Sequence, residues 1–140
     1  MALPNKNVVN FRAHDLEILS CDFNKYQEQI ITSSIDKTIK LWDLRNLKIP
    51  INILAGHRYP VRKAKFSPHQ ANIIASGSYD MNVNIWDLND LMKPLAFTHK
   101  EHTEFVVSLD FNLYNERQIA STGWDGRALV WNWNEPQPKC

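Results

Sequence analysis

Short segments in which apolar and polar residues alternate recur along the chain and predict β-strands. The alternation has a period of two, which turns one face of each strand toward a core and the other toward polar surroundings. In the segment 38–42, for example, Ile39 and Leu41 are expected to point inward and Lys40 outward. The predicted strands lie at 18–23, 29–33, 38–42, 51–54, 95–97, 105–111, 117–121 and 127–131. Polar turns between these segments predict an all-β fold of antiparallel hairpins.

A set of polar and aromatic residues repeats at nearly constant spacing through these strands. His14, His57 and His102 are 43 and 45 residues apart, and each stands at the start of a repeat. Each repeat also carries an Asp that precedes a Trp by six residues. Three such sets in register, at a period within the roughly 40–45 residues of a propeller blade, predict three blades. We place the repeats at approximately 14–54, 57–97 and 102–134.

The Gly-His pair at 56–57 and the Trp-Asp pair at 86–87 resemble the marks of WD-repeat proteins. This resemblance implies β-propeller blades, each with a structural set of one His, one Ser or Thr, one Asp and one Trp. A His that pairs with both the Asp and the hydroxyl, with the Trp N–H as a further donor, leaves few polar groups unsatisfied. The sets are His14, Thr32, Asp36, Trp42; His57, Ser76, Asp80, Trp86; and His102, Ser121, Asp125, Trp131.

Composition narrows the class of protein further. The chain has 16 basic and 15 acidic residues and a net charge of +1, so it lacks the basic excess of a nucleic-acid binder. Cys21 and Cys140 form neither a disulfide framework nor a metal-binding spacing, which is typical of a reducing compartment. No apolar run approaches the ~20 residues of a membrane span, and the start lacks the apolar core of a secretory signal. We therefore expect a soluble intracellular protein without cofactor or metal.

The number of repeats is smaller than the four or more blades of a closed propeller. Residues 8–11 predict the outer strand of an upstream blade, to which we assign residues 1–13. No outer strand is predicted after Trp131. We expect an open arc that forms the carboxyl-terminal part of a larger, seven-bladed propeller.

Stretches that blade formation does not require carry a closer resemblance. They are AHDLEILSCDFNKYQ at 13–27, IKLWDLRNLKIPINILAGHRYPVRKAKFSPH at 39–69, ASGSYDMNVNIWD at 75–87 and EHTEFVVSLDFN at 101–112. Together they resemble the last three repeats of the peroxisomal import receptors for the type 2 targeting signal, the peroxin-7 family. The resemblance implies a receptor that recognises the amino-terminal targeting helix of cargo proteins together with a co-receptor. It also implies shuttling between the cytosol and the peroxisomal matrix.

Candidate peptide-binding residues lie in the loops that carry the repeated His and Asp residues. Aromatic side chains beside carboxylates suit a helical peptide with a basic and an apolar side, which the family's targeting helix resembles. For Tyr79 and Trp124, packing between adjacent blades is the alternative interpretation. The candidate set is Glu17, Tyr59, Tyr79, Glu104, Phe105 and Trp124.

Other kinds of chemistry fit the sequence less well. His, Ser and Asp recur together as in hydrolase triads, but the grouping occurs three times and without a nucleophile elbow or an oxyanion loop. One His per repeat, without a neighbouring Cys or His, is a poor zinc spacing. His69 and His99 are expected in solvated loops. The basic residues Arg58, Arg62, Lys63 and Lys65 are interpreted as a solvated strand face, with a contact for an acidic partner as the alternative.

Two function classes follow, and neither is enzymatic. The first is the import receptor, and the second is a generic WD-repeat scaffold in an assembly such as chromatin or a ubiquitin ligase. We also expect the chain not to be a stable monomer, because the end blades of an open arc expose flanks that a ring would bury. A two-fold dimer that exchanges outer strands and approaches a six-bladed ring, or a complementing chain, would cover these flanks.

Overall fold

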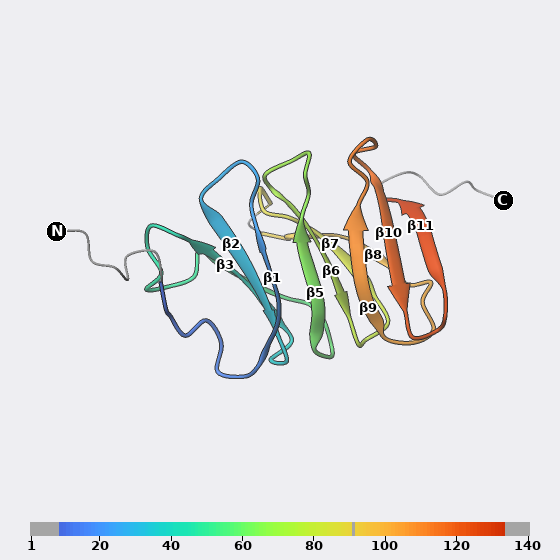
Figure 1. The fold of residues 1–140 in the computed structure, drawn as a ribbon, viewed down its shortest axis with the longest axis horizontal. Coiled ribbons are helices and arrows are strands. Elements are labelled where there is room, and N and C mark those ends of the chain that lie inside the picture. Colours follow the sequence, from blue (N-terminus) through green and yellow to red (C-terminus); the bar gives the residue numbers. More distant parts are fainter. Residues whose placement is uncertain (1–8, 91, 134–140) are drawn as a thin grey trace.

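The computed structural model describes residues 9–90 and 92–133 and contains three antiparallel β-sheets in that part of the chain (Figure 1). The first two sheets have the strand orders β1-β2-β3-β4 and β5-β6-β7-β8, and the third has the order β9-β10-β11. The strands are β1 Ile18–Phe23, β2 Gln29–Ser34, β3 Thr38–Asp43, β4 Asn52–Ala55, β5 Val61–Phe66, β6 Ile73–Ser78, β7 Val83–Asp87, β8 Leu95–His99, β9 Val106–Phe111, β10 Gln118–Gly123 and β11 Ala128–Asn132. The predicted all-β fold of repeated hairpins is confirmed.

The hairpin between the second and third strand of each sheet turns at an equivalent position. Lys37, Met81 and Gly126 all have a positive φ, of 74°, 73° and 73°. This left-handed conformation is unfavourable for a residue with a side chain and easy for glycine, so the first two turns need support from neighbouring groups. In the first turn, an oxygen of Asp36 accepts a hydrogen bond of 2.9 Å from the Thr38 N–H across the bend. The aspartate thus helps to close the hairpin.

Apolar side chains pack between neighbouring sheets and form two cores. Ile39 and Leu41 are buried as predicted, whereas the ammonium group of Lys40 donates to the carbonyl of Ala13 at 3.1 Å. The core between the first and second sheets contains Ile31, Ile39, Leu41, Leu54, Val61, Ala64, Phe66, Ile74 and Trp86. The core between the second and third sheets contains Ile73, Ala75, Val83, Ile85, Val106, Leu109, Phe111, Ile119 and Trp133. Each sheet therefore depends on its neighbour for burial of apolar surface.

The innermost strands β1, β5 and β9 lie next to one another and run in the same direction (Figure 1). Each strand begins after a loop that carries a repeated His and ends at the opposite side of the molecule. The loops 12–17, 56–60 and 101–105, together with the turns 35–37, 79–82 and 124–127, form one edge of the arc. We call this edge, which lies at the bottom of Figure 1, the His-Asp edge.

The structure differs from the sequence-based expectation at two outer segments. Residues 9–11 belong to no strand, because a strand needs a pairing partner; Val8 lies outside the described residues. Phe11 instead packs edge-to-face on Trp42, with the ring centroids 4.9 Å apart. The expectation of a solvated loop at His99 was wrong, because β8 continues to this residue, which pairs with Val83.

Candidate functional site

Each sheet holds a hydrogen-bonded set of four side chains behind the His-Asp edge. In the second sheet, His57 Nδ1 lies 2.8 Å from a carboxylate oxygen of Asp80, and Nε2 lies 2.7 Å from the Ser76 hydroxyl. The indole N–H of Trp86 donates to the same hydroxyl at 2.8 Å. In the first sheet the His14–Asp36, His14–Thr32 and Trp42–Thr32 distances are 2.7, 2.8 and 3.0 Å. In the third sheet the His102–Asp125, His102–Ser121 and Trp131–Ser121 distances are 2.9, 2.8 and 3.1 Å. Each set links a loop to a hairpin turn.

The carboxylates of these sets are held in the ionised form. Burial alone would raise the pKa of Asp80, but the hydrogen bond and positive field of His57 and the N–H groups of Arg58 and Asn82 outweigh it. The net result is a pKa below the ordinary value for this carboxyl group. At Asp36 and Asp125, burial also acts to raise the pKa, but hydrogen bonds outweigh this effect and hold the pKa of each carboxyl group below its usual value. An ionised acceptor at each turn strengthens the hydrogen bonds that fix the loops.

Main-chain hydrogen bonds place the residue before each of these aspartates next to a His-bearing loop. The N–H of Ile35 donates to the Glu17 carbonyl at 3.0 Å, and the N–H of Trp124 donates to the Phe105 carbonyl at 2.9 Å. In the third sheet this approach requires Gly123, because a Cβ there would lie 2.6 Å from the Phe105 oxygen. Phe105 and Trp124 are therefore held side by side by the backbone.

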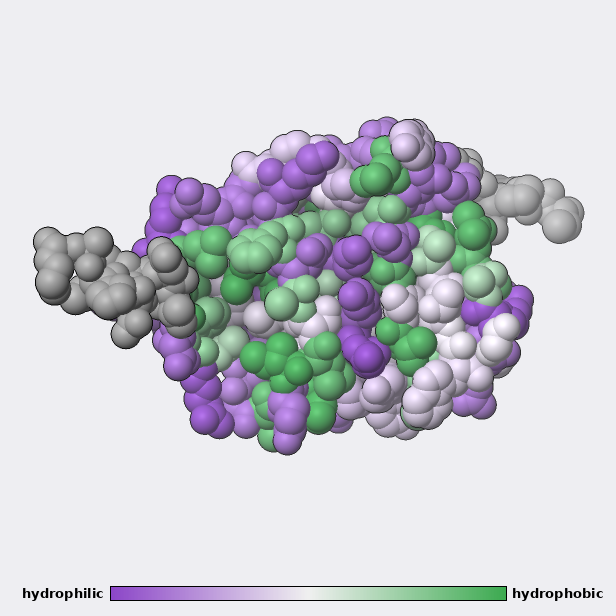
Figure 2. All heavy atoms as spheres, in the orientation of Figure 1, coloured by the Kyte–Doolittle hydropathy of each residue, from purple (hydrophilic) through white to green (hydrophobic). Residues whose placement is uncertain are grey.

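Three candidate residues form an aromatic cluster across the second and third sheets. The ring centroid of Tyr79 lies 4.6 Å from that of Phe105 and 6.4 Å from that of Trp124, and the Phe105 and Trp124 centroids are 5.0 Å apart. Trp124 is 66% exposed, although it is the largest of the three side chains. The cluster thus contributes contacts between sheets and also leaves an aromatic surface open. On the same lower edge, Figure 2 shows a separate, strongly apolar patch on the side of the first sheet.

The structure distributes the other candidate residues along the same edge. Glu104 is exposed and directly precedes Phe105, so it adjoins the aromatic cluster. Tyr59 is 54% exposed and lines a separate hollow with Asp80 and Met81. Glu17 is exposed on the first sheet in a hollow that also contains Leu16. Only Tyr79, Phe105 and Trp124, with Glu104 beside them, are thus brought together as one surface.

Sequence reasoning missed several contacts between sheets. Lys65, expected on a solvated face, donates to a carboxylate oxygen of Asp110 at 2.9 Å. His69, expected in a solvated loop, lies with Nε2 2.7 Å from the Asn112 carbonyl. The ring of His99 stacks on Trp131 with centroids 4.0 Å apart. These pairs join different sheets, so no local sequence pattern identifies them.

The chemistry that the edge offers comes from its exposed side chains. Within residues 9–90 and 92–133, no group of three or more His, Cys, Asp or Glu side chains is placed to hold a metal ion. In the same part of the chain, no helix has the length and apolar character needed to cross a bilayer. An exposed aromatic cluster beside a carboxylate offers apolar contact, hydrogen bonding and attraction for a cation.

Comparison with known families agrees with the three sheets and their polar sets. Residues 5–43, 48–87 and 93–132 match the family described as WD domain, G-beta repeat. The chain belongs to this family. Its sheets are accordingly WD-repeat blades, and the resemblance inferred from the Gly-His and Trp-Asp pairs is confirmed.

Several curated relatives of this WD-repeat chain carry related names. The Peroxisomal targeting signal 2 receptor of Saccharomyces cerevisiae is 37% identical over 163 residues, which cover 91% of the chain and 44% of the relative. The Mus musculus protein of the same name is 44% identical over 88 residues, covering 63% and 27%. Peroxisome biogenesis protein 7 of Arabidopsis thaliana is 52% identical over 84 residues, covering 60% and 26%. The chain spans less than half the length of these relatives.

Proposed function

We propose that this chain acts in a receptor for the type 2 peroxisomal targeting signal and recognises the amino-terminal signal helix of cargo proteins. The names of the relatives support the assignment to this import pathway. The observation that carries the binding function is the exposed aromatic cluster of Tyr79, Phe105 and Trp124 beside Glu104. Binding takes place without covalent chemistry and together with a co-receptor.

The cluster and its neighbouring carboxylate match the two sides of a basic amphipathic helix. The apolar side of the helix packs on Trp124 and Phe105, because exposed aromatic rings offer a large apolar area at a small loss of side-chain entropy. An Arg or Lys of the helix binds Glu104 through a charge-assisted hydrogen bond. Glu17 and Tyr59, farther along the same edge, contact other parts of the peptide.

The three polar sets contribute by holding the loops before the peptide arrives. Each set ties a His-bearing loop to a hairpin turn, and the bond from Trp124 N–H to Phe105 fixes two of the contact residues. A preformed surface loses less conformational entropy on binding than a mobile one. The receptor then carries its bound cargo from the cytosol to the peroxisomal matrix.

Peptide affinity tests this function directly. A fluorescent type 2 signal peptide is titrated with the chain in the presence of co-receptor, and anisotropy is measured. Glu104→Gln should weaken binding about tenfold or more, because a charged hydrogen bond is worth about 1.5–3 kcal/mol. Trp124→Ala should weaken it as well, through loss of apolar contact. Glu116→Gln removes an equal charge in the exposed loop between β9 and β10, at the opposite side of the sheet, and serves as the control.

The outcomes separate the two function classes. Equal affinities of Glu104→Gln and Glu116→Gln for a peptide that does bind would exclude Glu104 from the site. Absence of peptide binding by the folded chain with co-receptor would instead favour a general WD-repeat scaffold.

A further inference from the structure

The hollow that Tyr59 lines has a volume of about 470 Å³ and lies beside the outer strand of the middle sheet. Its walls come from the loop before β5, the turn between β6 and β7, and the strands β7 and β8. The second sheet packs against the first on one side and against the third on the other. The hollow is therefore open although this chain supplies both neighbours of the sheet, and its exposure does not arise from either end of the sequence.

One position on the third strand of the sheet accounts for the hollow. Asn84 pairs with Ser76, and this register makes it equivalent to Lys40 in the first sheet. The Lys40 ammonium group donates to the carbonyl of Ala13, the residue directly before the repeated His. The shorter side chain of Asn84 makes no such bond. Asn84 lines the hollow and is only 2% exposed, and its Oδ1 is buried without a hydrogen-bond partner.

The hollow is rich in free donors and has a positive net charge. The exposed side chains of Arg58 and Lys100 and the hydroxyl of Thr98 line it, and within the described residues none of them has a hydrogen-bond partner. The carboxylate of Asp80 also lines it but already accepts hydrogen bonds within its polar set and its turn. Two cations and one carboxylate leave a single positive charge. An unpaired buried acceptor beside free cations calls for a ligand with both a donor and a negative charge.

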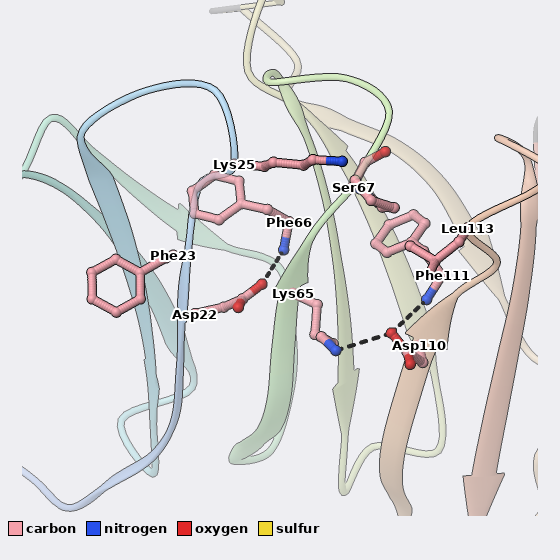
Figure 3. Close-up of a pocket in the computed structure, with 10 residues that line it drawn as sticks. Asp22, Phe23, Lys25, Lys65, Phe66, Ser67, Asp110, Phe111 and Leu113 are labelled. Atoms are coloured by element: carbon pink, nitrogen blue, oxygen red, sulfur yellow. Dashed lines mark hydrogen bonds and ion pairs between the residues drawn. The ribbon is translucent and has the colours of Figure 1, made fainter.

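The hollow at the opposite edge of the inner strands lacks this property, because its cations have partners within the chain. Lys65 there donates to Asp110 at 2.9 Å (Figure 3). The ammonium group of Lys25 lies 5.9 Å from the ring centroid of Tyr26, within the range of a cation–π contact. Of these two hollows, only the one beside β8 combines free cations with an unpaired buried acceptor.

We propose that the hollow beside β8 binds an Asp or Glu residue in an acidic peptide segment of a partner protein. The side-chain carboxylate accepts hydrogen bonds from Arg58 and Lys100, and the main-chain N–H of the same residue donates to Asn84 Oδ1. The ring of Tyr59, which is 54% exposed, offers apolar contact to the adjoining part of the peptide. This ligand differs in charge from the basic signal helix, and the inference does not depend on recognition of that helix.

The charge of the lining favours a carboxylate over a phosphorylated side chain. A phosphoryl group carries a charge of about −1.5 to −2 at neutral pH. Part of that charge would find no counter-charge, because Asp80 already offsets one of the two cations. A single carboxylate matches the net charge of the hollow.

NMR titration of the isotope-labelled chain measures this binding without signal peptide or co-receptor. The probe is N-acetyl-glutamic acid N-methylamide, which carries one carboxylate and two amide N–H groups, and the glutamine analogue is the matched uncharged control. The side-chain amide signal of Asn84 and the main-chain signals of Gly56 and Arg58 should shift and saturate with the glutamate probe alone. The phosphoserine analogue should bind more weakly. Tighter binding of the phosphoserine analogue would overturn the assignment to a carboxylate.

Asn84→Lys is the sharpest variant, because it introduces the residue that the first sheet carries at this position. The new ammonium group should reach the carbonyl of Gly56, as Lys40 reaches that of Ala13, and fill the hollow. Binding should be lost although the variant adds a positive charge, whereas a merely basic surface would bind the anion more tightly. Asn84→Leu introduces the residue of the third sheet, Leu129, and removes the buried acceptor. It should also weaken binding, and it keeps the test decisive should Asn84→Lys unfold.

Charge variants test the two cations. Arg58→Gln and Lys100→Gln should each weaken binding of the glutamate probe about two- to fivefold, as expected for an exposed ion pair. Lys93→Gln removes the same charge in the exposed loop between β7 and β8, at the opposite edge of this sheet, and should leave binding unchanged. Thermal melting shows which variants are folded. Absence of a saturable shift in the wild type, equal binding of the glutamine analogue, or full binding by folded Asn84→Lys or Asn84→Leu would overturn the proposal. So would equal affinities of Arg58→Gln, Lys100→Gln and Lys93→Gln.

Discussion

Replacement of Asp80 by alanine is the most direct test of the polar sets. The Asp80 side chain is almost inaccessible to solvent and accepts hydrogen bonds from His57 Nδ1, the Arg58 N–H and the Asn82 N–H. In Asp80→Ala the His57 donor remains buried without a partner, which costs about 1–3 kcal/mol. The two main-chain donors lie near the surface and regain water, so they add about 1 kcal/mol together. We expect a total loss of about 2–4 kcal/mol in the free energy of unfolding.

Thermal and urea unfolding at one fixed protein concentration measure this loss. The expected decrease in melting temperature is on the order of 10 °C, from the usual relation for domains of this size. Fixed concentration matters because association of copies would itself change the apparent stability. Asp15→Ala removes a fully exposed carboxylate in the loop after His14 and is the matched control. Unchanged unfolding of Asp80→Ala relative to Asp15→Ala would refute the structural role assigned to the sets.

Two further predictions concern pH and the half-buried His99. Because the pKa of Asp80 is lowered in the folded state, its contribution to stability is present above the ~3.9 of an unfolded Asp. Acid titration of the unfolding free energy should therefore show a decline below about pH 4 that is smaller in Asp80→Ala. For the imidazole of His99, burial instead disfavours the charged form and lowers the pKa below 6.5. The unfolded chain therefore binds this proton at a higher pH than the folded chain, and stability should fall from roughly pH 7 to pH 5. His99→Leu should remove that decline with pH. It also removes the buried Nδ1 atom that has no hydrogen-bond partner, so at pH 7 the variant should be about 1 kcal/mol more stable than the wild type in urea unfolding. A variant that is no more stable than the wild type would contradict this.

The repeated features of the fold could be predicted from the sequence because they are local or periodic. Alternation gave the strands, and the spacing of His14, His57 and His102 gave the number of sheets. The hydrogen bonds of the polar sets follow from residue type once the repeat is aligned, since each His, hydroxyl and carboxylate has one place in the hairpin. The family of the chain followed from the same pattern.

Contacts that differ from repeat to repeat could not be predicted in this way. The positions equivalent to Lys65 are Asp22 and Asp110, so the ion pair with Asp110 arises only from the order of the sheets. His99 occupies the position that corresponds to Leu54, and its ring stacks on Trp131 of the next sheet. In the candidate site, sequence reasoning selected Tyr59 and Tyr79 for the same reason, but only Tyr79 joins the aromatic cluster.

These two classes of residue affect different properties of the arc. The polar sets act within a sheet and are alike in all three, so they fix the shape of each blade and the position of its loops without distinguishing one blade from another. The inner-strand residues at 20–23, 63–66 and 108–111 act between sheets and vary in charge, so they determine which blade can follow which. The Ser-x-Asp-Phe pattern, present in the first and third repeats and absent from the second, makes the trailing side of the third blade chemically similar to that of the first. Loss of a polar set therefore lowers the stability of its blade and loosens the loop that the set holds, whereas a change at the inner strands alters the contact with the neighbouring blade.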